Sequence, residues 1–375
     1  MGSTDPKKKT GKKRMTKEER AKKKRNRIIL IAVEVFVLLL MLIALYIVVL
    51  FGKIHHEDIK DEDIVINDGI DGENDINASD IATNEGLGGH MSGYRNVALF
   101  GVDARDKSLG KGNRTDTIIV ASINETTKEV KLVSVYRDTY LNIGNDSYNK
   151  ANSAYAKGGP LQAINMLNMN LDLNITDYVT VGCAGVADTI DALGGVEIDV
   201  DESEINHLNN YQVETSKSLG KSYNKVTSTG LQTLDGIQAV SYCRIRYTAG
   251  DDFKRTERQR EVIQAILDKA KKANIATLNK AANTIFEEIS TSMTFTEITE
   301  LLTDVASYSI GETDGFPAEQ YRATGDVHGA SCVMSTDLTA DVLSLHQFLF
   351  GDVGDYQPSS EVQSIAAKVH SDTGK

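Results

Sequence analysis

Hydrophobic positions follow a continuous pattern near the start of the chain. The segment from Ile28 to Phe51 is apolar on all sides and carries one charge, Glu34. At ~1.5 Å per residue, a helix of this length spans ~36 Å, enough to cross a hydrocarbon core of ~30 Å. A cleaved signal peptide would have a shorter apolar run and a small-residue cleavage site. The sequence therefore predicts one transmembrane helix over residues 28–51.

Beyond residue 94 the pattern changes to short apolar runs of strand length, separated by turns or by helical periodicity. Strands are predicted at 96–103, 116–124, 129–138, 177–183 and 196–200. Helices are predicted at 158–171, where Pro160 lies near the first turn, and at 186–195, which ends in two glycines. Short hairpin links combined with helical crossovers predict an α/β fold: a single α-β-α sandwich domain on a mixed central sheet.

Composition divides the chain further. Residues 1–27 hold thirteen lysines and arginines against three acidic residues, so this tail has a charge of about +10. The chain as a whole has a net charge of −12, so the remaining residues are strongly acidic. The positive-inside rule places the tail in the cytoplasm and everything after Phe51 outside the cell. Residues 52–93 are acidic and lack periodicity, which predicts a flexible linker. The predicted domain covers 94–350, and the polar residues 351–375 are expected to form a loose tail.

The stretch "RIRYTAGDDFKRTERQR", residues 244–260, concentrates positive charge. The preceding sequence alternates like a strand, so Arg244 and Arg246 are expected on one face. In the helix that follows, Asp252, Arg255 and Gln259 project within roughly 40° of one another, on the side of the apolar stripe. These five side chains are therefore expected to converge.

The other arginines of this stretch project differently. Arg258 and Arg260 fall on the flanks or the far side of the helix, so they are expected to be solvated. The inward residues could form an internal salt-bridge network, for example between Asp252 and Arg244. Three converging arginines exceed the charge of one aspartate, which favours an anion site.

A second cluster lies upstream, in "GVDARDKSLGKGNRTDT". Asp103 ends one strand and Asp116 begins the next, an arrangement that can hold a hard cation, although aspartates also favour ordinary turns. The cations of this region and of the following strand ends are Arg105, Arg114, Arg137 and Lys150. No HExxH or GxSxG motif occurs, and the three cysteines show no metal-ligand spacing. This profile fits metal-assisted phosphoryl transfer.

Taken in order, "GVDARD", "NRTDT", "SVYRDT", "YNKANSAYAKGG", "LDGIQAVSYCRIRY" and "GDDFKRTERQREVI" resemble the motifs of the LytR-CpsA-Psr family of cell-wall ligases. The resemblance covers most of residues 94–270. It implies a membrane-anchored phosphotransferase of a Gram-positive cell wall. Such an enzyme moves a glycopolymer from a polyprenyl-pyrophosphate carrier to a peptidoglycan hydroxyl, with Mg²⁺, or Mn²⁺ in its place, on the pyrophosphate. The glycopolymer stays open between teichoic acid, capsule polysaccharide and other wall glycans.

The same resemblance assigns roles by position. Metal binding falls to Asp103 and Asp116, and catalytic roles fall to Arg244, Arg246, Asp252 and Asp103. Either aspartate, Asp103 or Asp252, would accept the proton of the attacking hydroxyl. Pyrophosphate binding is expected of Arg105, Arg114, Arg137, Lys150, Arg244, Arg246, Arg255 and Gln259. The sequence departs from the family pattern at Tyr136, where proline is usual.

Three other interpretations stay open from the sequence alone. The same site with water as acceptor would be a polyprenyl-pyrophosphate phosphatase. A non-catalytic lipid-binding attenuator would use the site for binding only. A nucleic-acid-binding transcriptional regulator is disfavoured, because the arginine stretch is predicted to lie outside the cell in an acidic domain that repels phosphate backbones. Residues 177–193 are either the lining of a lipid groove or ordinary core.

Overall fold

The computed structural model describes residues 48–70, 89–104, 109–246 and 251–375. Residues 1–27, most of the predicted transmembrane helix and Arg105 lie outside these ranges. Within the described ranges, no helix combines the length and apolar character needed to span a membrane. The chain divides into two compact units, Met1–Gly52 and Lys53–Lys375. In the first unit, residues 48–51 are helical; the second contains the domain described below.

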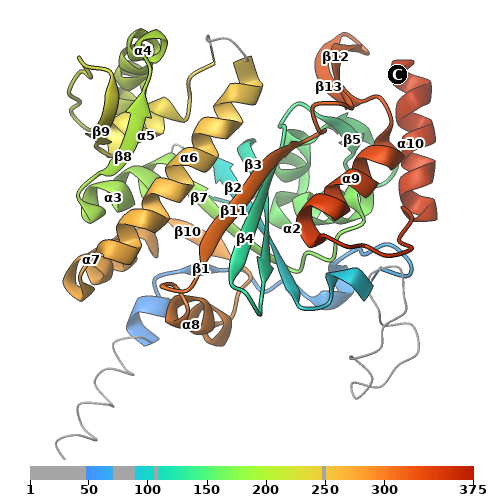
Figure 1. Ribbon diagram of the computed structural model, residues 1–375, viewed down its shortest axis with the longest axis horizontal. Coiled ribbons are helices and arrows are strands. Elements are labelled where there is room, and N and C mark those ends of the chain that lie inside the picture. The colour runs from blue at the N-terminus through green and yellow to red at the C-terminus, as the bar shows by residue number, and fades with distance from the viewer. Residues whose placement is uncertain (1–47, 71–88, 105–108, 247–250) are drawn as a thin grey trace, which may run out of the picture. The chain divides into compact units, whose positions relative to one another are not determined.

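A seven-stranded mixed sheet forms the centre of the domain (Figure 1). Its order is β1 (His55–His56), β10 (Ile289–Thr291), β7 (Asp177–Gly182), β2 (Tyr94–Val102), β3 (Thr115–Asn124), β4 (Glu129–Val135) and β11 (Ser309–Phe316). β2 runs parallel to β7 and antiparallel to β3, and β4 runs antiparallel to β3 and parallel to β11. The predicted α/β fold on a mixed sheet is confirmed.

The alternation of side chains along β3 divides the sheet into two buried faces. Ile118 and Val120 face a large core shared with α2 (Asn152–Leu171), α9 (Leu338–Phe350) and α10 (Ser360–Thr373). Ile119 and Ala121 face the other side, where Ile263 of α6 (Asp251–Lys272) packs against them. Helices therefore cover both faces of the central strands.

A smaller lobe adjoins α6 and has its own hydrophobic core. It consists of α3 (Cys183–Leu193), β8 (Val196–Val200), α4 (Glu202–Leu219), β9 (Gly230–Leu234) and α5 (Gly236–Tyr242). The remaining elements are η1 (Asp61–Asp63), η2 (Gly89–Met91), β5 (Tyr140–Asn142), β6 (Tyr148–Lys150), α7 (Ile275–Ile285), α8 (Phe295–Thr303), β12 (Arg322–Val327) and β13 (Ala330–Ser335). Val262 of α6 belongs to the core of the lobe, so α6 is packed between the sheet and the lobe.

One predicted strand is wrong. The run before Arg244 forms helix α5 and a loop, because Asp235 and Gln238 make a capping box that begins a helix there. The helix predicted from residue 158 begins earlier, at Asn152, and is kinked at Gly159, whose φ is 72°. Pro160 directly follows the kink and so occupies the first turn of the second helical part, as predicted.

In two segments that were expected to be loose, residues that the structure describes belong to the fold. In the predicted linker, β1 joins the central sheet, and Ile54 and Ile70 are buried. In the predicted polar tail, α10 buries Val362, Ile365 and Val369 in the main core. Apolar residues spaced three and four apart along a mostly polar helix are enough to attach it to the domain.

Asp341 of α9 provides a test of the packing in the main core. Its carboxyl is fully buried and accepts a hydrogen bond from the backbone N–H of Ala318 at 3.1 Å. Burial raises the pKa of Asp341 to about 7. Because the pKa of this carboxyl is higher in the folded than in the unfolded chain, the free energy of unfolding falls as pH rises from ~4 to ~7, by roughly 3–4 kcal/mol.

We therefore expect Asp341→Asn to be more stable than the unmodified chain at pH 8 and equally stable near pH 4. Asparagine keeps the acceptor for Ala318 but cannot ionise. Urea unfolding at both pH values measures the difference, and Asp352→Asn, at an exposed position, is the control. Equal stabilities at pH 8 would show that Asp341 ionises without cost.

Candidate functional site

Strand direction gathers four candidate or neighbouring residues at one edge of the sheet. β2, β4 and β7 end at this edge and β3 begins there, because β3 runs antiparallel to β2 and β4. Asp103 follows β2, Arg137 follows β4, and Cys183 follows β7. Asp116 is the second residue of β3. The upstream cluster predicted from the sequence is therefore brought together by the order of the strands.

A β-bulge sets the direction of Asp116. Gly101 pairs with Thr117 and Val102 pairs with Thr115, so Asp116 is the extra residue between the two pairs. Bulges turn a side chain away from the regular alternation and are common next to active sites. Gly101 is required at this close approach, since an added Cβ would lie 2.9 Å from Cβ of Thr117.

Arg137 links this cluster to Asp116 and Asp138. Its Nη1 pairs with Asp116 Oδ1, and its Nε lies 3.7 Å from Asp138 Oδ1. Burial lowers the pKa of Arg137, but the carboxylates of Asp116 and Asp138 outweigh this effect and raise it. Lys150 Nζ lies 3.4 Å from Asp138 Oδ1. Asp138 was not among the predicted site residues, although it directly follows Arg137 in the "RDT" motif.

The second cluster lies at the start of α6. Asp252 Oδ1 lies 3.4 Å from Arg246 Nε and 3.1 Å from Arg255 Nη1. The salt bridge considered between Asp252 and Arg244 is therefore not formed. Arg244 instead donates to Thr215 Oγ1 at 3.0 Å and lies 3.7 Å from a carboxylate oxygen of Glu214.

Electrostatic interactions join the two clusters. Burial lowers the pKa of Arg255, whose side chain is 3% exposed, and the charges of Asp252, Arg246, Arg137 and Asp116 modify the shift. Asp252 in turn acts on the pKa of Arg137. The rings of Tyr136, next to Arg137, and Phe253, next to Asp252, have centroids 4.7 Å apart, so the strand-end residues and the start of α6 form one site.

Asp103, Arg244 and Cys183 extend the same site. Burial raises the pKa of the Cys183 thiol to about 11, and the charges of Asp103, Arg244 and Asp116 act on it. Asp103 and Arg114 are exposed, and neither forms a hydrogen bond or ion pair within the described ranges. Asp103 is therefore accessible to a ligand.

Several buried polar atoms of this site have no hydrogen-bond partner among the residues that the structure describes. They are Arg137 Nε, Asp252 Oδ1, Arg255 Nε, Arg255 Nη1 and Gln259 Oε1. Of these, Arg255 Nη1 and Asp252 Oδ1 form an ion pair at 3.1 Å but no hydrogen bond. A buried polar group without a hydrogen bond costs ~1–3 kcal/mol, so proteins rarely leave several together. Three buried guanidinium N–H groups that make no hydrogen bond, on Arg137 after β4 and on Arg255 of α6, indicate a site for an anionic ligand.

The prediction that Arg258 and Arg260 are solvated is wrong. Arg258 is 1% exposed and donates to Glu204 Oε1 at 2.7 Å and to the carbonyl of Ile245 at 3.2 Å. Arg260 donates to Ser134 Oγ at 2.7 Å on the sheet side. Both flanks of α6 are covered, one by the lobe and one by the sheet, so neither faces solvent.

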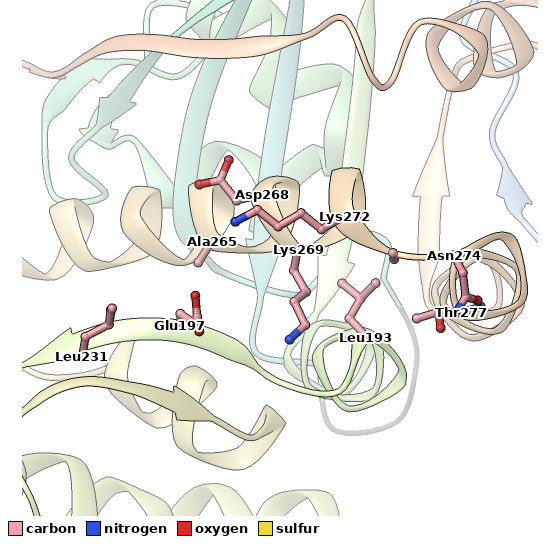
Figure 2. A pocket seen from close by; sticks show the side chains of 10 residues that line it. Leu193, Glu197, Leu231, Ala265, Asp268, Lys269, Lys272, Asn274 and Thr277 are labelled. Carbon is pink, nitrogen blue, oxygen red and sulfur yellow. Dashed lines mark hydrogen bonds between the residues drawn. The ribbon is translucent and has the colours of Figure 1, made fainter.

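An open groove of about 550 Å³ lies elsewhere, between the second half of α6 and the lobe (Figure 2). Its lining carries charges of both signs: Lys269 and Lys272 are positive, and Glu197 and Asp268 are negative. None of the predicted site residues lines it. The groove is therefore separate from the candidate site.

The fold and the site define an α/β domain that gathers arginines, a lysine and carboxylates at one edge of a mixed sheet, a combination suited to a phosphate-bearing ligand. The chain belongs to the LytR_cpsA_psr family, whose sequence model matches residues 58–344. The family suggested by the sequence motifs is confirmed.

Three relatives illustrate the likeness. The polyisoprenyl-teichoic acid–peptidoglycan teichoic acid transferase TagU of Enterococcus faecalis is 33% identical over 215 residues, which cover 56% of this chain and 66% of TagU, just under two thirds. The crystal structure of Bacillus subtilis TagV superimposes with a TM-score of 0.53 at 26% identity, covering 71% of this chain and 98% of TagV. The structure of TagT bound to LI-WTA superimposes with a TM-score of 0.56 at 24% identity, covering 71% of this chain and 92% of the TagT chain. These likenesses confirm the fold.

Proposed function

We propose that the chain is a polyisoprenyl-teichoic acid–peptidoglycan teichoic acid transferase. It would move the polymer from a polyprenyl-pyrophosphate carrier onto a peptidoglycan hydroxyl and release polyprenyl phosphate. The name of the TagU relative supports the substrate pair. The observation that carries the proposal is the group of buried guanidinium N–H groups on Arg137 and Arg255 that make no hydrogen bond. Guanidinium groups match the geometry and charge of pyrophosphate oxygens.

In this proposal the arginines hold the pyrophosphate, while the carboxylates hold the arginines. Asp252 keeps Arg246 and Arg255 in place, and Asp116 keeps Arg137 in place. The acceptor hydroxyl oxygen attacks the phosphorus that bears the polymer. The bond from that phosphorus to the bridging oxygen breaks, and its electron pair leaves with polyprenyl phosphate.

The proton of the acceptor hydroxyl needs a base, and the sequence left Asp103 and Asp252 as candidates. Asp252 is already engaged by two arginines. Asp103 is exposed at the end of β2 and makes no hydrogen bond or ion pair within the described part of the chain. We therefore assign the proton to Asp103.

The two carboxylates Asp103 and Asp116 also fit a bound Mg²⁺ or Mn²⁺ ion. Magnesium in proteins is commonly bound by one or two carboxylates together with substrate phosphates. Asp116 offers the oxygen that is not paired with Arg137, and Asp103 offers one oxygen while the other accepts the proton. When bound, the ion would neutralise charge on the pyrophosphate. Within the described residues, no group of three or more His, Cys, Asp and Glu side chains is placed to bind a metal.

The proposed location is the outer face of the cell membrane. The apolar run 28–51 would anchor the chain, and the basic residues 1–27 would stay in the cytoplasm. A reporter fused after Lys375 should be active only outside the cell. Cytoplasmic activity of that reporter would exclude the proposed reaction, because peptidoglycan lies on the other side of the membrane.

Transfer itself can be measured with the full chain in detergent, a lipid-linked teichoic acid precursor and peptidoglycan. We expect a phosphodiester-linked polymer on the peptidoglycan, and a loss of at least about 100-fold in Arg246→Ala. Arg95→Gln is the matched control, since Arg95 pairs with Asp177 and Glu297 at the opposite end of β2. Inorganic phosphate as the sole product would instead identify a phosphatase.

A further inference from the structure

A cation and two aromatic rings meet beside the proposed site. The rings of Tyr136 and Phe253 lie edge to face, with centroids 4.7 Å apart and an angle of 75° between their planes. Arg322 Cζ lies 3.8 Å from the centroid of Phe253 and 5.2 Å from that of Tyr136. Arg322 Nη1 also donates to the Tyr136 hydroxyl at 2.6 Å. We name Tyr136, Phe253 and Arg322 the bracket.

The bracket joins three elements that are far apart in the sequence. Tyr136 follows β4 and directly precedes Arg137, whereas Phe253 lies in α6 directly after Asp252. Arg322 begins β12. Each aromatic ring is thus one residue away from a member of the proposed site, and Arg322 connects the two rings.

The bracket is held firmly on its strand side. Tyr136 is 6% exposed, and a Cβ added at Gly315 of β11 would overlap its hydroxyl group. The β12–β13 hairpin is fixed to the same loop, because the backbone N–H of Val333 donates to the Asp138 carbonyl at 2.9 Å. Arg322 is therefore carried by a hairpin that is itself attached next to Arg137.

The chemistry of the bracket suits a structural link between the two halves of the site. A guanidinium group over an aromatic face is attracted to the ring, and the hydrogen bond to Tyr136 fixes its orientation. Among the described residues, the side chain of Arg322 forms no ion pair with a carboxylate. Its side-chain contacts are thus directed to the two rings.

We propose that Arg322 is a positioning residue, which through Tyr136 and Phe253 sets the distance between Arg137 and the start of α6. The proposal rests on the proposed pyrophosphate site and adds to it a residue from a distant part of the chain. Tyr136 supplies both a ring and the hydroxyl that accepts from Arg322.

The test uses the full chain in detergent and a short-chain polyprenyl pyrophosphate as the probe. We expect Arg322→Met to weaken probe binding by about 10- to 100-fold, because small displacements of binding groups are costly. The melting temperature should stay close to that of the unmodified chain. Arg322→Lys should recover part of the loss, since it keeps a cation but not the planar group.

Lys131→Met is the matched control. Lys131 lies on β4 as well, with Nζ 5.5 Å from the centroid of Phe348, but at the other end of the strand. It should bind the probe normally. If Arg322→Met binds the probe normally too, or if its melting temperature falls enough to account for the lost binding, the positioning role is wrong.

A double-variant cycle with Arg137→Ala separates positioning from direct contact. If Arg322 acts through Arg137, the effect of Arg322→Met should largely disappear in the Arg137→Ala background. Fully additive effects would mean that Arg322 contacts the probe itself, which overturns the proposal. Failure of the proposed function would be seen in a different variant: if the pyrophosphate site itself is wrong, Arg246→Ala should bind the probe normally. If only the positioning role of Arg322 is wrong, Arg246→Ala should still bind the probe weakly.

Discussion

Arg255→Met is expected to lose at least about 100-fold of the transfer activity while unfolding at the same or a higher denaturant concentration. The reason for the retained stability is the state of the guanidinium group. It is buried, and Nε and Nη1 have no hydrogen-bond partner within the described chain. Burial lowers the pKa of Arg255, which reflects the cost of keeping its charge away from water.

Removing Arg255 leaves no new uncompensated charge. Asp252 loses its ion pair with Arg255 Nη1 at 3.1 Å but keeps Arg246 Nε at 3.4 Å, and it is itself one-third exposed. Methionine fills a similar volume and removes donors that cost ~1–3 kcal/mol each when unsatisfied. The stability of the free protein should therefore rise or stay unchanged, while the ligand loses a partner.

Urea unfolding and the transfer assay on the same preparation measure both effects. Arg255→Lys is a useful second variant, because it keeps the charge but loses the bidentate geometry, and it should lose activity as well. A fall in unfolding free energy of more than about 2 kcal/mol in Arg255→Met would mean that Arg255 is a structural arginine. The unpartnered donors would then need another explanation.

The sequence predicted β2, β3, β4 and β7 of the central sheet, because each carries a local apolar pattern, but it did not predict β1, β10 and β11. It also predicted the inward position of Arg255 and Gln259, which continue the apolar stripe of α6. It failed for Arg258 and Arg260, because a helical wheel locates one buried face, whereas both flanks of α6 are covered as well: the lobe contacts Arg258 and the sheet contacts Arg260. Contacts that depend on a distant lobe leave no signal within the helix.

The same distinction applies to the site. The proximity of Asp103, Asp116 and Arg137 follows from strand ends and could be expected. The bulge that turns Asp116 arises from the pairing of two strands, and no residue type in the sequence predicts it. The helical α5 was missed because alternation was given more weight than the capping residues Asp235 and Gln238. For α10 the spacing of its apolar residues was a usable signal.

Arg258→Met is expected to lower the free energy of unfolding by about 3–5 kcal/mol. Arg258 and Glu204 are 1% and 4% exposed, and their charged atoms lie 2.7 Å apart. Without Arg258, Glu204 would remain as a buried charge with no cation beside it. Denaturant unfolding measures the loss, and Lys254→Met, which breaks a pair between half-exposed Lys254 and Glu257, should cost less than ~1 kcal/mol.

The double variant Arg258→Met/Glu204→Gln separates stability from function. Glutamine removes the buried charge but can still accept from the backbone N–H of Asp201 in the capping box of α4, so most of the lost stability should return. Binding of a polyprenyl pyrophosphate should stay weak, because the carbonyl of Ile245 has lost the donor that holds it. That carbonyl lies between Arg244 and Arg246, so its release disturbs both arginines. Recovery of binding together with stability would instead limit Arg258 to a role in folding.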